Sequence, residues 1–215
     1  MPAPKVDPWK WSELKLFLQH PAVRAHRLLP VLLLSATTGL RRGEVCGLQW
    51  SDLDLVARRL VVRKARTVVR YEVHEGEPKS RSGTMRSGLL APEVVAALLR
   101  WQLVQEEEAD QLGVPRPAYV ATAADGSPLH PERLTRTFQQ LRKLVGLRPV
   151  RLHDLRHGYA SKLLKEGVPM AVVSMMYGHA DIRTTVNIYG HLDVTEGLEA
   201  ADLAVSELGL DEVLS

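Results

Sequence analysis

Cysteine and long apolar runs are scarce in this sequence of 215 residues. The single cysteine, Cys46, has no partner for an internal disulfide, which suits a reducing cytoplasm. We expect it to be a small, buried helix residue. The longest apolar run, Leu28 to Leu34, contains Pro30 and is far too short to cross a bilayer. Met1 to Pro8 is rich in proline and lacks an apolar centre, so it does not have the pattern of a signal peptide.

The sequence also lacks a strong net charge. The formal charge is +3 and the pI is about 9.1, which alone is weak evidence for a polyanionic partner. The distribution is more informative, because Arg24 to Arg70 holds ten basic residues against three acidic ones, whereas Leu192 to Ser215 holds seven acidic residues and no lysine or arginine. This segregation predicts one face for a polyanion and an acidic end held away from it.

Length and apolar content fit one globular domain, with no internal repeat or low-complexity segment. Apolar spacing and Gly or Pro signals predict a mainly α domain with a small antiparallel β-sheet near the front, an α+β class. The predicted helices are Trp11 to Gln19, with Ser12 as its cap, His26 to Thr37, Arg41 to Gln49, Glu93 to Gln111 and about Glu132 to Val145. The predicted strands are Leu60 to Val62, Thr67 to Val69, Tyr71 to Val73 and Leu89 to Leu90, with punctuation at Glu75 to Pro78.

The stretch from Val150 to Leu192 is unusually rich in histidine. His153, Arg156 and His157 stand at i, i+3 and i+4 and therefore share one helical face. The apolar Tyr159, Leu163 and Leu164 are expected to turn another face inward.

Three stop signals divide this stretch into consecutive helices. Gly167 and Pro169 end the first helix and allow a second, and Gly178 ends the second with His179 in the turn. Asp181 can cap a third short helix, which carries Tyr189 and ends at Gly190.

These residue types suit phosphoryl transfer at a phosphodiester. An arginine grips two phosphate oxygens at once, and two arginines can neutralise a pentacoordinate transition state without a metal. A tyrosine can form a covalent ester with phosphorus, provided that a base or a positive potential offsets its ordinary pKa near 10. A lysine is a suitable acid for a departing alkoxide.

Each signal is weak when taken alone. Arg41 and Glu44 resemble a surface helix pair worth about 0.2–0.5 kcal/mol. His153 and His157 resemble half a zinc site, but the glutamate of the usual metalloprotease helix is absent and Asp154 stands at the wrong place.

The ordered combination is a stronger signal. The segment TTGLRRGEVCGLQWSDLDL, Thr37 to Leu55, resembles the first arginine box of the tyrosine recombinases, or phage integrases, and LHDLRHGYAS, Leu152 to Ser161, resembles their His-x-x-Arg box. PKSRS, Pro78 to Ser82, is similar to their lysine motif, and MYGHADIRTTVNIYGHL, Met176 to Leu192, to their third box. The resemblance implies the catalytic-domain fold of that family over residues 11–192, preceded by a short lead, 1–10, and followed by an acidic amphipathic tail, 193–215.

The resemblance also implies roles for individual residues. The implied catalytic residues are Arg41, Lys79, His153, Arg156, His179 and the nucleophile Tyr189, with Glu44, His157 and His191 in support. The implied reaction is site-specific cleavage and rejoining of double-stranded DNA through a 3′-phosphotyrosyl intermediate, with no metal, ATP or other cofactor. A bacterial, phage or mobile-element origin and a cytoplasmic location follow from the same resemblance.

Two departures from the family pattern bear on these assignments. Tyr177 stands where the family usually has leucine. The segment after Lys79 lacks the usual basic pair and proline, so Arg81 or Arg86 are alternatives for contacting DNA there. No segment corresponds to the core-binding domain that most integrases carry, so the sequence looks like an isolated catalytic domain.

Other functions stay open at this point. The chain could be a DNA-binding remnant without catalysis, a relaxing enzyme similar to type IB topoisomerases, or, less readily, a hydrolytic metalloenzyme using His153, His157 and His179. The tail has an apolar stripe of Leu198, Ala201, Val205 and Leu208, which suits packing on its own domain and docking on a neighbouring protomer equally well. The resemblance favours the second option, in a homotetramer on DNA.

Overall fold

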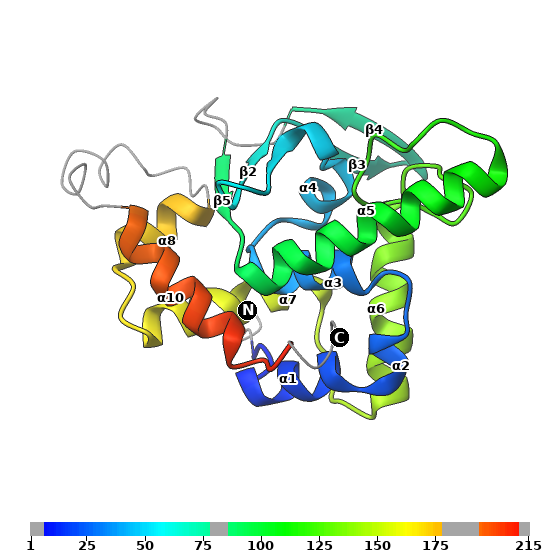
Figure 1. Ribbon diagram of the computed structural model, residues 1–215. Coiled ribbons are helices and arrows are strands. Elements are labelled where there is room, and N and C mark those ends of the chain that lie inside the picture. Colours follow the sequence, from blue (N-terminus) through cyan, green and yellow to red (C-terminus); the bar gives the residue numbers. More distant parts are fainter. Residues whose placement is uncertain (1–6, 78–85, 178–193, 211–215) are drawn as a thin grey trace.

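A computed structural model describes residues 7–77, 86–177 and 194–210. Helices make up most of these residues, and two small antiparallel sheets lie together at one end (Figure 1). The predicted α+β class, mainly α with antiparallel strands, is therefore confirmed. The helices are α1 (Trp11–Gln19), α2 (Pro21–Arg24), α3 (Leu29–Thr37), α4 (Arg42–Gly47), α5 (Pro92–Leu112), α6 (Pro131–Val145), α7 (Leu152–Lys165), α8 (Met170–Tyr177) and α10 (Val194–Ser206), with a 3-10 turn η1 (Trp50–Asp52).

The sheet is divided into two, where the sequence predicted one. The first has the order β1 (Leu53–Asp54), β2 (Arg59–Val62) and β5 (Arg86–Leu89), and the second pairs β3 (Ala65–Val69) with β4 (Glu72–Gly76).

The second sheet is a hairpin that closes with Val69 opposite Glu72. Arg70 and Tyr71 form its two-residue turn, with φ of 48° and 72°. The prediction that Tyr71 begins a strand is therefore wrong, because two positive φ values match the twist of a tight hairpin. The strand continues instead through Glu75 and Gly76, which the sequence suggested as punctuation.

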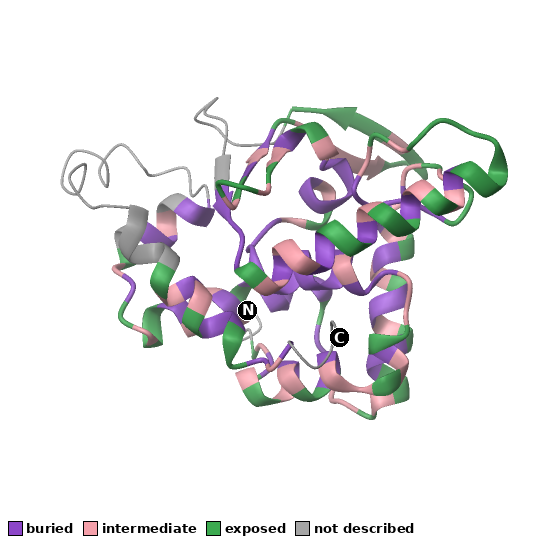
Figure 2. Cartoon of the chain, viewed as in Figure 1, coloured by how far each residue is buried: buried purple, intermediate pink, exposed green. Residues whose placement is uncertain are grey.

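Helix α3 is the centre of the main core. All its residues except Pro30 are buried, and it packs against α4, α5 and α7 (Figure 2). The helix begins at Leu29, not at His26 as predicted, since Pro30 lacks a backbone N–H and fits only the first turn of a helix.

Helix α1 has the predicted bounds but a different cap. The Glu13 carboxylate accepts the backbone N–H of Lys10 at 2.7 Å, and Ser12 lies inside the first turn. Acidic residues hold the starts of α4, η1 and α7 in the same way, through Glu44, Asp52 and Asp154.

A second apolar cluster lies between α7, α8, α10 and β5. It contains Tyr159, Leu163, Val173 and Tyr177 from the two helices that carry the histidine-rich stretch. Leu164, expected to point inward, is 36% exposed instead. Helix α7 ends at Lys165 before Gly167, whose φ is 86°, so the predicted stop there is confirmed.

The tail helix α10 packs on its own chain. Ala201, Val205 and Leu208 are buried in the two clusters, and the Trp11 indole N–H donates to the carbonyl of Ala204 at 3.0 Å. Of the two options for the apolar stripe, the structure has packing within the domain. No helix in the described ranges is long and apolar enough to span a membrane.

Candidate active site

Arg41 immediately precedes α4 and is fixed by one buried carboxylate. Glu44 accepts the backbone N–H of Arg41 and its Nη1, both at 2.8 Å. The Glu44 side chain is only 2% exposed, whereas that of Arg41 is 41% exposed. The guanidinium is therefore tethered on one side and accessible on the other.

Two glycines allow the strand region to lie directly on α4. A Cβ at Gly43 would come within 2.8 Å of the carbonyl oxygen of Arg66, and a Cβ at Gly47 within 2.8 Å of that of Lys64. The first arginine box therefore needs small residues at these positions so that the start of β3 can support the helix next to Arg41.

Arg156 reaches the same region from α7, and it is buried. Its Nη2 donates to the carbonyl of Tyr177 at 2.6 Å and its Nη1 donates to the carbonyl of Gly39. The guanidinium carbon lies 4.4 Å from the centre of the Tyr177 ring. Gly39 is two residues before Arg41, so one short loop links the two arginines.

Arg41 and Arg156 line one open pocket of about 270 Å³. Two imidazoles, those of His153 and His157, complete its polar wall. Leu164 belongs to its apolar lining, together with Ala160, Met170, Val173 and Tyr177. Two guanidiniums at one pocket can hold a single phosphate group from two sides.

The two histidines contact each other edge to face, with ring centres 5.1 Å apart. Partial burial, the His157 imidazole and the Arg156 guanidinium all lower the pKa of His153 below its ordinary value. A lowered pKa keeps this imidazole neutral near pH 7, and a neutral imidazole can accept a proton.

Asp154, next to His153 in the sequence, forms its hydrogen bonds with Arg151. It accepts the backbone N–H of Arg151 at 2.8 Å and pairs with the Arg151 side chain at the same distance. Burial alone would raise its pKa, but the hydrogen bonds from Arg151 outweigh that effect and lower it. The residue therefore caps α7.

Cys46 is buried, as predicted, and burial raises the pKa of its thiol to about 12. Within the described ranges no three His, Cys, Asp or Glu side chains gather as a metal site would require. The other predicted site residues, Lys79, His179, Tyr189 and His191, lie outside the described residues, as does Arg81.

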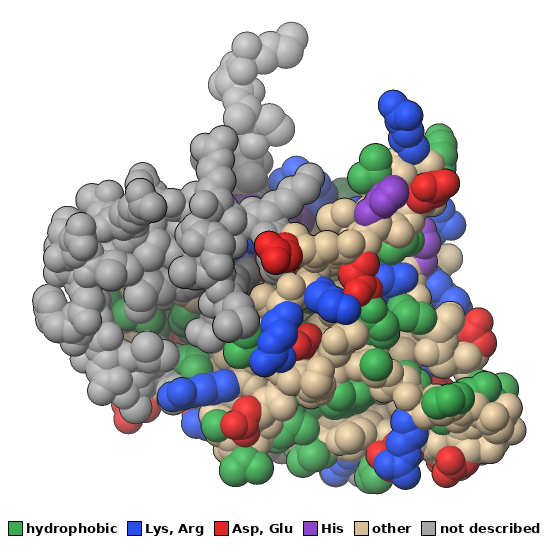
Figure 3. Space-filling model, turned by 90° about the horizontal axis from the view of Figure 1, so that it is seen from above, with side chains coloured by type: hydrophobic (Ala, Val, Ile, Leu, Met, Phe, Trp, Pro, Cys, Tyr) green, Lys and Arg blue, Asp and Glu red, His purple; other side chains and the backbone are tan. Residues whose placement is uncertain are grey.

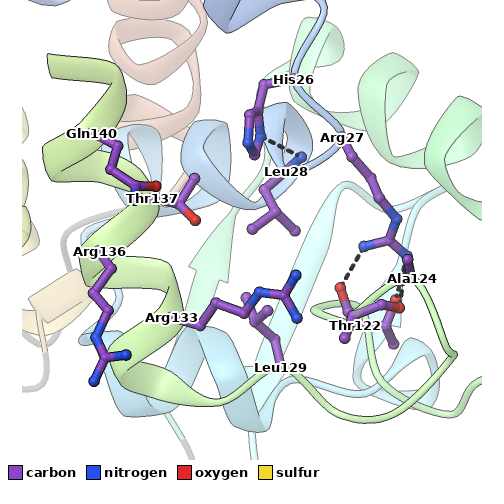
Figure 4. A pocket seen from close by; sticks show the side chains of 11 residues that line it. His26, Arg27, Leu28, Thr122, Ala124, Leu129, Arg133, Arg136, Thr137 and Gln140 are labelled. Atoms are coloured by element: carbon purple, nitrogen blue, oxygen red, sulfur yellow. Dashed lines mark hydrogen bonds between the residues drawn. The ribbon is translucent and has the colours of Figure 1, made fainter. Parts of the chain in front are cut away.

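A second pocket, of about 380 Å³, lies where the N-terminal half of α6 faces the segment between α2 and α3 (Figure 4). Arg133 extends from α6 into this pocket, and Arg136 lies one turn further along the helix. Arg27 is engaged there by Glu108 and by the backbone carbonyl of Thr122. We call this region the α6 pocket.

Two acidic residues of the tail pair with basic side chains of the domain. Asp202 of α10 pairs with Arg58 at 2.7 Å, and Glu207 pairs with Lys162. Viewed from the side of the sheets, the described surface shows lysine and arginine side chains interspersed with acidic ones (Figure 3). Charges that are segregated in sequence are thus partly neutralised by pairing in space.

The sequence did not predict a role in a pocket for Tyr177, Arg133 or Arg136. Tyr177 stood out only as a departure from the usual leucine. Its position inside the third box, immediately before Gly178, was the available signal, because a residue there ends α8 beside Arg156. The signal for Arg133 and Arg136 was the basic first half of the α6 helix, which begins at Pro131.

Comparisons with known proteins find relatives over most of the chain. The Phage integrase family model matches residues 11–196. The chain is 31% identical over 185 residues to a tyrosine recombinase XerC-like protein of Caldanaerobacter subterraneus subsp. tengcongensis, covering 80% of this chain and 47% of the relative. It is 29% identical over 202 residues to the ICEBs1 integrase of Bacillus subtilis, covering 92% and 54%. The chain thus spans about half the length of these curated relatives.

Solved structures show the same fold. The Tn1549 transposon integrase in complex with transposon right end DNA matches with a TM-score of 0.70 at 20% identity, covering 97% of this chain and 67% of that one. XerA recombinase matches with a TM-score of 0.63 at 24% identity, covering 98% and 66%. With a family model covering most of its length and the fold of tyrosine recombinase catalytic domains, this chain belongs to the phage integrase family.

Proposed function

We propose that this chain is the catalytic part of a site-specific DNA recombinase that breaks and rejoins strands of double-stranded DNA. The observation that carries the proposal is the pocket shared by Arg41, which precedes α4, and Arg156 of α7, both of which are held in place by the protein. Family membership supports it, as does the likeness to an integrase whose structure is a complex with DNA.

The proposed cleavage step transfers a phosphoryl group from DNA to Tyr189. The phenol oxygen attacks the scissile phosphorus, and the bond from phosphorus to the 5′ oxygen breaks. This leaves a 3′-phosphotyrosyl link and a free 5′-hydroxyl. Arg41 and Arg156 hold the nonbridging oxygens and neutralise the charge that develops in the transition state.

Proton transfers complete the step. His153 accepts the phenol proton as a neutral base, consistent with its lowered pKa. In this proposal Lys79 protonates the leaving oxygen and His179 adds a hydrogen bond to the phosphate. The 5′-hydroxyl of a second strand then reverses the reaction on the tyrosyl ester, so that bond energy is conserved and strands are exchanged without ATP.

The remaining contacts with DNA are assigned to the α6 pocket. The Arg42 guanidinium, adjacent to Arg41, donates to the Thr135 hydroxyl of α6 at 3.1 Å. This bond ties the start of α4 to the turn of α6 that holds Arg133 and Arg136. In this proposal Arg133 and Arg136 contact phosphates that flank the scissile one, since arginine contacts with phosphates position a protein on a duplex.

We further propose that the chain assembles as a homotetramer on DNA. The apolar stripe of α10 is used within the domain, so assembly through the tail requires other residues of α10 or an exchange of the helix between protomers. Leu203 on this helix is 52% exposed. Native mass spectrometry of the chain on a recombination substrate would measure the stoichiometry, and Leu203→Glu should reduce assembly without unfolding; an unchanged tetramer would reject this surface.

The decisive experiment for the proposed reaction traps the covalent intermediate. The chain is incubated with nicked duplexes that carry candidate recombination sites, in which the released 5′-hydroxyl fragment diffuses away. A protein–DNA adduct that survives denaturation is expected, with DNA attached to the peptide containing Tyr189.

Matched variants separate chemistry from folding. Tyr189→Phe should abolish the adduct while DNA binding is kept, and Tyr71→Phe, in the exposed hairpin turn, should leave the adduct unchanged. Arg41→Lys should also fail, since one point charge cannot replace a bidentate fork. An adduct that persists in Tyr189→Phe would reject the assignment of the nucleophile.

A further inference from the structure

We propose that Tyr177 is a positioning residue for Arg156 and sets the direction in which that guanidinium faces the scissile phosphate. The inference rests on the proposed function, because it concerns how one phosphate-binding arginine is oriented. Neither residue is remote from the pocket, since both line it.

Three contacts join Tyr177 to Arg156. The Tyr177 carbonyl accepts Nη2 of Arg156 at 2.6 Å, the ring lies against the guanidinium at 4.4 Å, and the phenol hydroxyl donates to the Arg156 carbonyl at 2.8 Å. The first contact needs only the backbone, so any residue at this position can make it. The second and third need an aromatic ring and a hydroxyl.

The geometry constrains the arginine on two sides. The carbonyls of Tyr177 and Gly39 take one donor from each terminal nitrogen, and the ring covers a face of the planar group. A guanidinium held by both edge and face cannot tilt freely, so its orientation relative to the pocket is fixed.

The backbone around Gly39 is built to accept this ring. Gly39 has a φ of 63°, and a Cβ placed there would lie 2.6 Å from Cζ of Tyr177. The tyrosine is itself only 3% exposed. The loop before Arg41 therefore packs directly on the side chain that holds Arg156, and Tyr177 couples the placement of both arginines.

Two substitutions divide these contacts. Tyr177→Phe removes only the hydroxyl bond and keeps the ring against the guanidinium, so we expect near-normal cleavage. Tyr177→Leu removes ring and hydroxyl but keeps the carbonyl, and should slow formation of the covalent adduct by about tenfold or more, the effect of losing a desolvated cation–π contact. DNA affinity should change little in either variant, because most of the binding comes from other phosphates.

A general loss of packing would also slow cleavage, so the effect must be shown to pass through Arg156. In an Arg156→Lys background, adding Tyr177→Leu should reduce the rate of adduct formation little further. If the two residues acted independently, the two reductions in rate would multiply. On a substrate whose scissile phosphate is replaced by a neutral methylphosphonate, the defect of Tyr177→Leu should shrink, because less charge has to be neutralised there.

The orientation can also be read without catalysis. In the chain labelled with ¹⁵N-arginine, the side-chain signals of Arg156, assigned by their loss in Arg156→Lys, should carry a ring-current shift in the wild type and in Tyr177→Phe. The shift should disappear in Tyr177→Leu. A wild-type chain that forms no adduct would reject the proposed function and leave this measurement as the test of the contact.

Two results would overturn the inference. One is wild-type cleavage kinetics in Tyr177→Leu, and the other is a full, multiplicative loss when that change is added to Arg156→Lys.

Discussion

The contact between Glu44 and Arg41 predicts a substitution whose effects on stability and on chemistry can be separated. In Glu44→Ala, the backbone N–H of Arg41 loses the acceptor that caps α4, and the guanidinium loses its tether. A lost helix cap costs about 0.5–2 kcal/mol. The ion pair adds at most about 1 kcal/mol, because the Arg41 side chain is 41% exposed and partly screened.

The free energy of unfolding should therefore fall by about 2 kcal/mol. For a chain of this size this corresponds to a Tm lower by about 4–8 °C. Thermal and urea unfolding followed by circular dichroism would measure the loss. Glu132→Ala is the matched control, because Glu132 also lies in the first turn of a helix but pairs with Arg136 on an exposed face, a contact worth about 0.3–0.5 kcal/mol.

A second variant isolates the charge. The side-chain oxygen of Glu44→Gln can still accept the N–H of Arg41, so stability should be largely kept while Arg41 is held less firmly and adduct formation slows. If Glu44→Ala unfolds at the same temperature as Glu132→Ala, the carboxylate does not fix the start of α4 and the reasoning fails.

The remaining predictions concern the loop, the base and the α6 pocket. Gly39→Ala should lower the free energy of unfolding by about 1–2 kcal/mol because the backbone there is left-handed, and by about 1–3 kcal/mol more because the new Cβ crowds the Tyr177 ring. Unfolding in urea would measure this loss, and a variant as stable as the wild type would contradict the prediction. Because the pKa of His153 is lowered from 6.5, cleavage should stay constant from neutral pH to about that value and then fall on acidification as the imidazole protonates. Stability should fall over the same range, since the unfolded chain binds that proton more readily; His153→Gln should remove this acid limb, and an unchanged profile would reject the base. Arg133→Gln and Arg136→Gln should each weaken DNA binding uniformly across sequences and reduce the slope of log affinity against log salt by about 1; an unchanged slope in fluorescence anisotropy titrations would remove the α6 pocket from the DNA surface.

The alternatives raised by the sequence are separable by simple assays. A relaxing enzyme would remove supercoils from plasmids that lack a specific site. A hydrolytic metalloenzyme would lose cleavage in EDTA, whereas the proposed reaction would not. A DNA-binding remnant would retain affinity and form no adduct.

The sequence by itself determined the local elements and the identity of the box residues. The bounds of α1 agree with its apolar spacing, and the Gly167 stop after α7 was correctly placed, because spacing and backbone chemistry act within a few residues. Local sequence signals gave wrong predictions where contacts with other residues determined the conformation. Tyr71 lies in a hairpin turn although its side chain favours strands, and Glu13, not Ser12, caps the start of α1.

Only the tertiary structure decided that Arg41 and Arg156 share one pocket, because this depends on how α3, α4 and α7 pack. The tertiary structure alone also decided where α10 packs, with Asp202 paired to Arg58, and that Arg156 is buried against the Tyr177 ring. Periodicity tells which side of a helix is apolar, but it does not tell which surface covers that side. The arrangement of the two guanidiniums around one pocket arises from packing between distant segments, and no local pattern encodes it.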